Sequence, residues 1–206
     1  MLHRTPFLLP LLFPNLLWRV PTTEKLLFLT FDDGPVPGPT EAVLTILKEQ
    51  GVAATFFCIG DNVRKHRAVF ERVRAEGHAV ANHTRNHQNG WKTNTATYLA
   101  NVHACDADLG QPAPLFRPPY GRITPGQVRQ LSAKKIVMWD VLTRDYDRTL
   151  TPEACLRGSL HVIRPGSIVV FHDSLKAEKN LLYALPRFLE GARQQGYTFA
   201  LIHHHI

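Results

Sequence analysis

Short apolar runs alternate with longer amphipathic segments along most of this chain. After residue 25, runs rich in β-branched and aromatic residues recur at 26–31, 53–59, 78–83, 114–119, 135–141, 167–173 and 197–202. Most of them are continuously apolar, as expected for strands that are covered on both faces. Segments with apolar residues at helical spacing lie between them, at 39–51, 61–76, 94–109, 124–134, 151–161 and 180–194. This alternation predicts a parallel sheet with helices outside, either doubly wound or closed as an incomplete (β/α) barrel.

The composition is that of one globular domain. The chain has 206 residues, of which 44% are apolar and 20% charged, so it can bury a core and is not of disordered composition. The net charge of +7 suits an anionic partner, but the Lys and Arg residues are scattered. We therefore expect an ordinary solvated surface and no nucleic-acid binding. We also expect a monomer. Cys58, Cys105 and Cys155 are widely spaced, which argues against a disulfide framework or a thiolate zinc site.

Residues 1–24 form an apolar segment ahead of a domain that we place at 25–206. The segment begins like a targeting signal, but Pro10 and Pro14 interrupt it, and no apolar piece approaches the ~20 residues that span a bilayer. We expect an arm packed on the domain. An atypical export signal stays open, as does an anchor on a membrane surface through Phe13, Leu16, Leu17 and Trp18. The compartment is therefore open between the cytoplasm and the cell envelope, and the histidines at 203–205 are interpreted as a native exposed end.

Ionisable side chains stand where the predicted strands end. Asp32 and Asp33 follow the first strand, and His83 and His87 follow the third. Both α/β arrangements gather reactive groups at the carboxyl ends of strands. The spacing of the two histidines predicts that both imidazoles lie on one face of a helical turn, and two imidazoles with one carboxylate can hold zinc or another first-row metal. One aspartate would then ligate while the other accepts a proton from water; the alternative is that the pair caps a helix or an Asx-turn before Gly34.

Three further strand ends carry polar residues of the same kind. They are Arg117 and Tyr120 in FRPPYG, Asp140, Asp145 and Tyr146 in MWDVLTRDYD, and His172 and Asp173 in VVFHDS. Each has an ordinary structural interpretation, such as a surface cation for Arg117 or a hydrogen-bonded histidine for His172. Their joint occurrence at successive strand ends favours one common site.

These motifs resemble, in order, those of the polysaccharide deacetylases of the NodB-homology type, carbohydrate esterase family 4. TFDDGP (30–35), HTRNH (83–87), RPPYG (117–121), the DY pair (145–146) and VFH (170–172) are similar to the first to fifth family motifs. The resemblance extends from about residue 25 to residue 202. It implies a single-domain, distorted (β/α)7-type barrel with parallel strands inside and helices outside.

The resemblance also implies an enzyme, a metal-dependent hydrolase that removes acetyl groups from N-acetylglucosamine units of a glycan such as peptidoglycan, chitin or a chito-oligosaccharide. By matching motifs, Asp33, His83 and His87 would hold the metal. Zn²⁺ is expected, with Co²⁺ or Ni²⁺ as alternatives. Asp32 would be the general base and His172 the general acid. The alternatives are a non-catalytic metal- or carbohydrate-binding relative, and a metal-dependent hydrolase of another amide or ester such as acetylated xylan.

Supporting roles follow from the same resemblance. Arg117 would orient Asp32, Asp145 would pair with His172, and the backbone N–H of Tyr120 would hold the oxyanion. The substrate contacts that we expect are Pro118, Tyr120, Tyr146 and Trp139.

This sequence departs from the family pattern in its last two motifs. Tyr146 stands where the family usually has Trp, and Val170 stands where Leu or Ile is usual. Asp140 therefore competes with Asp145 for the place beside His172.

Overall fold

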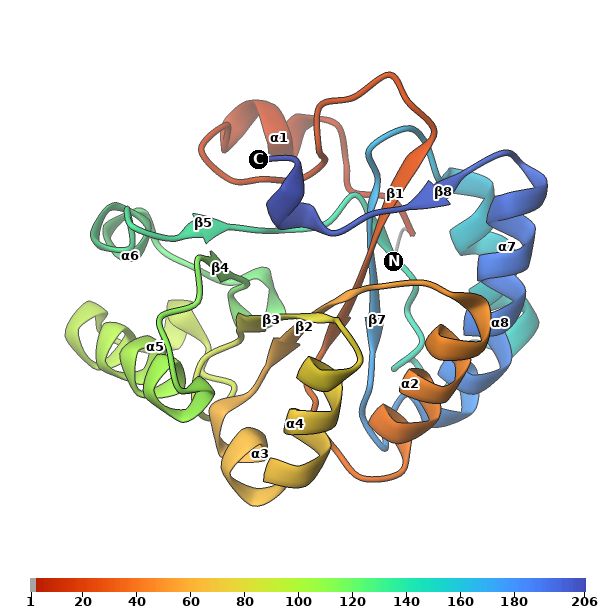
Figure 1. Ribbon diagram of the computed structural model, residues 1–206. Helices are drawn as coiled ribbons and strands as arrows, with labels where there is room; N and C mark the ends of the chain where they lie inside the picture. Colours follow the sequence, from red (N-terminus) through yellow and green to blue (C-terminus); the bar gives the residue numbers. More distant parts are fainter. Residues whose placement is uncertain (1–2) are drawn as a thin grey trace.

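A curled sheet of parallel strands forms the centre of the computed structural model, which describes residues 3–206 (Figure 1). The strands are β1 (Leu26–Asp32), β2 (Thr55–Cys58), β3 (Ala79–Asn82), β4 (Leu115–Phe116), β5 (Lys135–Ile136), β6 (Val141–Leu142), β7 (Ile168–His172) and β8 (Thr198–Phe199). Their order is β5-β4-β3-β2-β1-β7-β6, with β8 against β1. The predicted distorted (β/α) barrel is confirmed as a curled half-barrel in one domain.

Helices surround the outer face of this sheet (Figure 1). They are α2 (Pro39–Gln50), α3 (Gly60–Lys65), α4 (Arg67–Ala75), α5 (Thr95–Leu109), α6 (Pro125–Gln130), α7 (Pro152–Val162) and α8 (Glu178–Gln194). Short 3₁₀ turns occupy η1 (Gly90–Lys92), η2 (Pro119–Gly121) and η3 (Ile202–His204). The main core lies between sheet and helices, where Phe31 stacks on Phe56 and Phe171. The three cysteines are buried and free.

Two predicted elements are interrupted in the structure. The helix expected at 61–76 divides into α3 and α4 because His66 leaves helical geometry, with φ −125° and ψ 48°. The strand expected at 135–141 divides into β5, which pairs with β4, and β6, which pairs with β7. Between them, the carbonyls of Val137 and Met138 accept hydrogen bonds from the Arg117 side chain, at 3.2 and 2.9 Å. The run 135–142 therefore crosses from one edge of the sheet to the other.

The N-terminal segment hydrogen-bonds along that same run. Leu17 N donates to the carbonyl of Ile136 at 2.9 Å, Met138 N donates back to Leu17 at 2.7 Å, and Thr5 N donates to Asp140 at 2.9 Å. Between these contacts the segment forms a short helix, α1 (Leu8–Leu12), which has no buried residue. The arm is thus tied to the domain, although the boundary at residue 24 stays a prediction.

Burial separates the apolar residues of the arm into two groups. Leu17 and Trp18, which we considered as membrane contacts, are buried, and so do not face a surface. Phe13 is exposed. Among residues 3–206, no helix is long and apolar enough to cross a membrane.

Candidate active site

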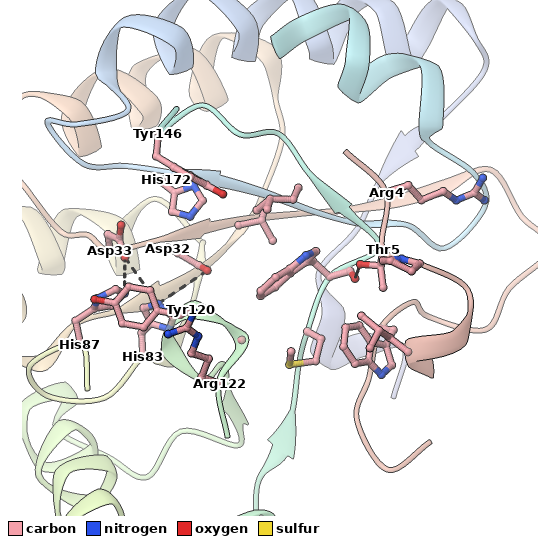
Figure 2. A pocket seen from close by; sticks show the side chains of 18 of the residues that line it. Arg4, Thr5, Asp32, Asp33, His83, His87, Tyr120, Arg122, Tyr146 and His172 are labelled. Atoms are coloured by element: carbon pink, nitrogen blue, oxygen red, sulfur yellow. Dashed lines mark hydrogen bonds and ion pairs between the residues drawn. The ribbon is translucent and has the colours of Figure 1, made fainter. Parts of the chain in front are cut away.

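One cavity of about 750 Å³ opens at the carboxyl ends of the central strands. Figure 2 shows Asp32, Asp33, His83, His87 and His172 together at one end of it. The arm lines the other end, and Trp139 lies on the cavity wall. Most of the polar lining was predicted from the sequence, but the contribution of the arm to the lining was not.

The adjacent aspartates separate because the strand ends between them. Asp32 is the last residue of β1, where it is buried and paired in register with His172 of β7. Asp33 has a φ of +80°, so its side chain leaves the strand in a different direction. A Cβ on Gly34 would lie 1.9 Å from the carboxylate of Asp173, so only glycine is accommodated there. Helix α2 begins at Pro39 with Gly38 as its N-cap, so the two aspartates do not cap it.

The two histidines meet through an irregular loop, and the predicted helical turn is wrong. Thr84 and His87 both have left-handed backbones, with φ of +62° and +59°. Thr84 O accepts a hydrogen bond from Gly60 N at 3.1 Å, and the Arg85 carbonyl accepts one from Asp61 N at 2.8 Å, so the start of α3 takes carbonyls that a helix would use internally. The imidazole rings of His83 and His87 nevertheless lie with their centroids 5.1 Å apart.

Donor atoms of Asp33, His83 and His87 lie within 4.8 Å of one another. Nδ1–H of His83 donates to the carbonyl of Arg117 at 2.7 Å. The proton is therefore on Nδ1, and Nε2 keeps a lone pair that can bind a metal, 3.7 Å from Oδ1 of Asp33. Nδ1 of His87 hydrogen-bonds with the Tyr120 hydroxyl at 3.0 Å, and its Nε2 lies 3.2 Å from the same Asp33 oxygen. Burial lowers the pKa of His83 to about 4, so this imidazole is neutral at pH 7. Two imidazole nitrogens and one carboxylate oxygen fit a first-row divalent cation.

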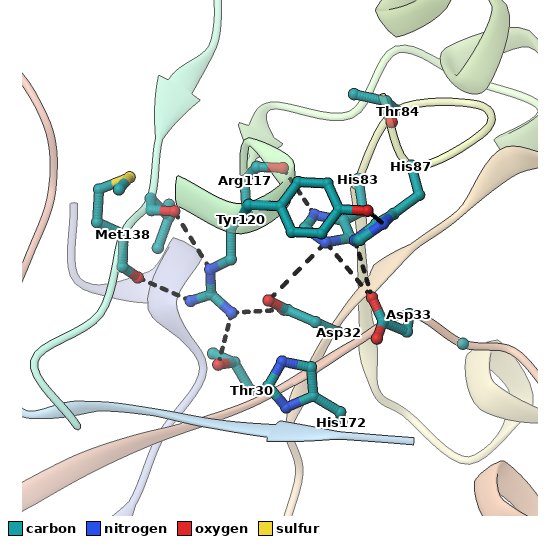
Figure 3. A network of polar contacts seen from close by, with 12 residues as sticks. Thr30, Asp32, Asp33, His83, Thr84, His87, Arg117, Tyr120, Met138 and His172 are labelled. Carbon is teal, nitrogen blue, oxygen red and sulfur yellow. Dashed lines mark hydrogen bonds and ion pairs between the residues drawn. The ribbon is translucent and has the colours of Figure 1, made fainter. Parts of the chain in front are cut away.

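Arg117 is fully buried beside Asp32 and is not a surface cation (Figure 3). One guanidinium nitrogen donates to Oδ1 of Asp32 at 2.6 Å and to the Thr30 hydroxyl at 2.8 Å. The guanidinium also lies over the ring of Phe57, 4.0 Å from its centroid. Burial lowers the pKa of Arg117, and the charge of Asp32 opposes that shift. With its other nitrogens bonded to the 137 and 138 carbonyls, the guanidinium holds Asp32 in one position.

His172 ends β7 and is paired with Asp145. Its Nδ1 lies 2.8 Å from Oδ1 of Asp145, and its backbone N donates to Oδ2 at 2.7 Å. Burial alone would lower the pKa of His172, but the Asp145 carboxylate, with Asp33 and Asp32, raises it to about 9. His172 is therefore an imidazolium at neutral pH, with Nδ1–H donating to Asp145.

Asp140, the competitor for that place, is bound elsewhere. Arg164 donates to both of its carboxylate oxygens, at 3.0 and 2.6 Å, and the Ser167 hydroxyl donates at 2.6 Å. Asp140 consequently fastens the start of β6 to the turn before β7.

Residues 19–138 match the sequence profile of the family described as polysaccharide deacetylase. The chain belongs to the polysaccharide deacetylase family. A peptidoglycan-N-acetylglucosamine deacetylase from Bacillus cereus is 30% identical over 195 residues, 90% of each chain. A chitooligosaccharide deacetylase from a Bradyrhizobium species is 38% identical over 154 residues, 71% of this chain and 69% of that protein. Against several other relatives the match spans between 30% and 55% of their length.

Solved structures resemble the whole deacetylase. The crystal structure of the Bc1960 peptidoglycan N-acetylglucosamine deacetylase, in complex with a naphthalenyl N-oxidanyl-benzamide, has a TM-score of 0.90 at 28% identity and covers 98% of this chain and 97% of that one. A carbohydrate esterase family 4 pseudoenzyme from Bacillus anthracis has a TM-score of 0.80 at 25% identity, covering 91% of this chain and 67% of that one. The predicted family is confirmed.

The predicted substrate contacts of the deacetylase fall in different places. Tyr120, with a left-handed φ of +61°, is 60% exposed at the cavity, and its ring packs edge-on against His87 at 4.5 Å between centroids. Tyr146 packs edge-on against His172 at 4.9 Å. Both tyrosines and Trp139 line the cavity. Pro118 is buried and is not part of the lining.

Two residues support the site in ways that were not predicted: Thr30 was not singled out in the sequence, and Asp173 was named only as a polar residue at a strand end. Thr30 accepts a hydrogen bond from Arg117 and donates one to the carbonyl of Val169 at 2.8 Å. It lies two residues before Asp32, so strand alternation would have placed both side chains on one face of the strand.

Asp173 is fully buried and accepts hydrogen bonds from Gly34 N at 3.0 Å and Thr40 Oγ1 at 2.7 Å. Burial raises its pKa to about 8, with the charge of Asp33 adding to the shift. It therefore shapes the turn that carries Asp33.

Replacing Arg117 with Met should destabilise the deacetylase by about 3–5 kcal/mol, because Asp32 would be left as a buried carboxylate without its cation. Urea unfolding measures this loss. Arg129→Met on the exposed face of α6 is the control, and we expect it to change the free energy of unfolding by less than about 0.5 kcal/mol. Equal stability of the two variants would contradict the structural role of the Arg117–Asp32 pair.

Proposed function

We propose that this deacetylase removes acetyl groups from N-acetylglucosamine units of a glycan and requires a divalent cation held by Asp33, His83 and His87. One observation carries the proposal: a carboxylate paired with a buried arginine and an imidazolium flank the same donor cluster in one cavity. The names of the Bacillus and Bradyrhizobium relatives support peptidoglycan or a chito-oligosaccharide as the glycan. We propose Zn²⁺ as the cation, since it suits two imidazoles and one carboxylate.

In this proposal Asp32 is the general base. When bound, a divalent cation acts as a Lewis acid toward a carbonyl oxygen and lowers the pKa of a water. Arg117 binds Oδ1 of Asp32, and the other oxygen, Oδ2, faces the donor cluster, 4.0 Å from Nε2 of His83. That oxygen is placed to accept a proton from the water that attacks the acetamide carbon.

His172 is the proposed general acid. Its Nδ1–H is held by Asp145, so the remaining Nε2–H is the proton that it can donate. As the carbon–nitrogen bond breaks, this proton passes to the departing nitrogen, and the products are acetate and a glucosamine unit. We propose that the Tyr120 backbone N–H stabilises the oxyanion and that Tyr120, Tyr146 and Trp139 form the walls around the acetyl group.

Acetate release from chito-oligosaccharides, peptidoglycan and acetylated xylan tests the substrate class. We expect acetate from at least one of the first two glycans and little from xylan. Release from xylan alone would replace the proposal with an ester hydrolase. If the metal-loaded protein releases acetate from none of them, it is a non-catalytic binding relative. The similarity to a pseudoenzyme structure is the reason to include this outcome.

Chelation should abolish the acetate release, because the site would lose the Lewis acid that polarises the acetamide carbonyl and lowers the pKa of the attacking water. Dialysis against a chelator followed by elemental analysis should show one equivalent lost, and added Zn²⁺ should restore turnover. His203→Ala, in the exposed C-terminal histidines, controls for adventitious metal and should leave the activity unchanged. Full activity in metal-free protein would contradict the cation requirement.

A further inference from the structure

The arm exposes a cluster of large apolar side chains that the proposed reaction does not use. We call Phe7, Leu8, Leu11, Leu12 and Phe13 the arm patch. Their exposed fractions are 75%, 53%, 71%, 67% and 46%. Across residues 3–206, nine large hydrophobic side chains are exposed, and five of them fall in these seven consecutive positions. Such clustering marks an interaction surface, because single exposed apolar residues are ordinary but contiguous patches are not.

The segment that carries the patch is hydrogen-bonded to the domain on both sides of the patch. Before it, Thr5 donates its N–H to Asp140 at 2.9 Å and its hydroxyl to the Trp139 carbonyl at 2.6 Å. After it, Leu17 exchanges hydrogen bonds with the 135–142 run, and Nε1 of Trp18 donates to the carbonyl of Phe13 at 3.2 Å. The excursion 6–16 is therefore anchored at both ends while the side chains of the arm patch face water; Leu9 and Leu16 pack against the domain.

The charges around the patch indicate what covers it. The first 23 residues contain Arg4 and Arg19 and no Asp or Glu. The C-terminal segment after Glu190 also lacks acidic residues, and its Ile202 packs in the same apolar cluster as Leu17 of the arm (Figure 1). Leucine and phenylalanine side chains on a segment whose charged side chains are all cationic match the interface of an anionic lipid surface. No helix among residues 3–206 spans a membrane, so contact would be with the surface.

We propose that the arm patch docks this protein on an anionic lipid surface. Pro6 and Leu9 lie in the same excursion and line the cavity that also contains Asp32 and His83. In Figure 2, Thr5 of the arm lies at one end of this cavity and the catalytic cluster at the other. Docking would hold the cavity beside the lipid headgroups. Resting on the proposed function, this docking implies that the glycan is attached to a membrane or lies against it.

Vesicle flotation tests the docking with the full chain. We expect binding to vesicles of phosphatidylglycerol and phosphatidylethanolamine, and much weaker binding to phosphatidylcholine alone. The double variant Leu11→Ser/Leu12→Ser should lower the bound fraction of protein at least about tenfold, since two leucine side chains leave the lipid. Leu175→Ser is the matched control, because Leu175 is 66% exposed outside the patch, and it should bind like the wild type.

Each other result overturns the docking. Binding of the double variant equal to that of Leu175→Ser would remove the patch as the contact. A wild-type dimer that becomes monomeric in the double variant, without vesicle binding, would make the patch a self-association surface. Circular dichroism shows that the variants are folded. Acetate release from a soluble chito-oligosaccharide, expected to be equal in all three proteins, tests the proposed function separately, because it needs no vesicle.

Discussion

The variant Asp32→Asn should lower acetate release by about 10³-fold or more and leave the metal content unchanged. An amide of nearly the same shape keeps an oxygen for Arg117, but it has no carboxylate oxygen to accept a proton from water. The three donors of the metal cluster are untouched. Turnover of a chito-oligosaccharide at pH 7 and elemental analysis of the same preparation measure the two quantities.

Asp33→Asn is the matched control, because it changes the adjacent carboxylate in the same way. We expect this variant to lose metal, since its Oδ1 is the oxygen near both histidine Nε2 atoms. Unchanged turnover in Asp32→Asn would eliminate Asp32 as the base. Metal loss in Asp32→Asn with metal retained in Asp33→Asn would mean that the two aspartates have exchanged roles.

Replacing His172 with Ala should lower turnover by about 10²–10⁴-fold without loss of metal, because the departing nitrogen would lack its proton donor. The cavity has other titratable groups, but Asp33, His83 and His87 are committed to the metal cluster in the proposal. A variant that retains turnover would show that another group protonates the amine. Thermal unfolding should accompany the assay, since His172 is also the partner of the buried Asp145.

The pH profile should identify the same residue. His172 must be protonated to act, and its pKa is raised to about 9, so kcat/KM should fall as the pH rises through about 9. Asp145→Asn removes the carboxylate that raises this pKa, so the alkaline limb should move to lower pH by about one unit or more. Asp147→Asn changes a partly buried carboxylate in the same loop that binds Arg144 and Thr149 and not His172, so it should leave the limb in place. An alkaline limb that stays at the same pH in Asp145→Asn would contradict the pairing as the cause.

Strand and helix positions and the cluster at the strand ends were predictable from local patterns, because a buried parallel strand is continuously apolar and its end is where polar residues reappear. The geometry within the cluster was not. His83 and His87 have helical spacing, yet hydrogen bonds from Gly60 and Asp61, more than twenty residues earlier, hold the loop in left-handed conformations. The spacing of two histidines cannot predict that N–H groups of a distant helix will bind the carbonyls between them.

Long-range contacts also explain the interrupted strand. The run 135–142 has the composition of one strand, but Arg117 takes the carbonyls at 137 and 138, and the arm takes other backbone groups along it. Neither partner is adjacent in sequence. Asp140 shows the same limit, since its contact with Arg164 and Ser167 depends on how β6 and β7 pair and not on the motif around it.

The hydrogen-bonded arm has a practical consequence for shortening the chain. The match to the family profile begins at residue 19, after the whole excursion of the arm. A truncated chain that begins there would lose the backbone partners of Ile136, Met138 and Asp140, so part of the 135–142 run would become an open sheet edge. Open edges pair with other chains and promote aggregation. A truncation placed at the start of the profile match would therefore lower solubility without removing any residue of the proposed active site. Precipitation of such a shortened protein would say nothing about its catalytic residues.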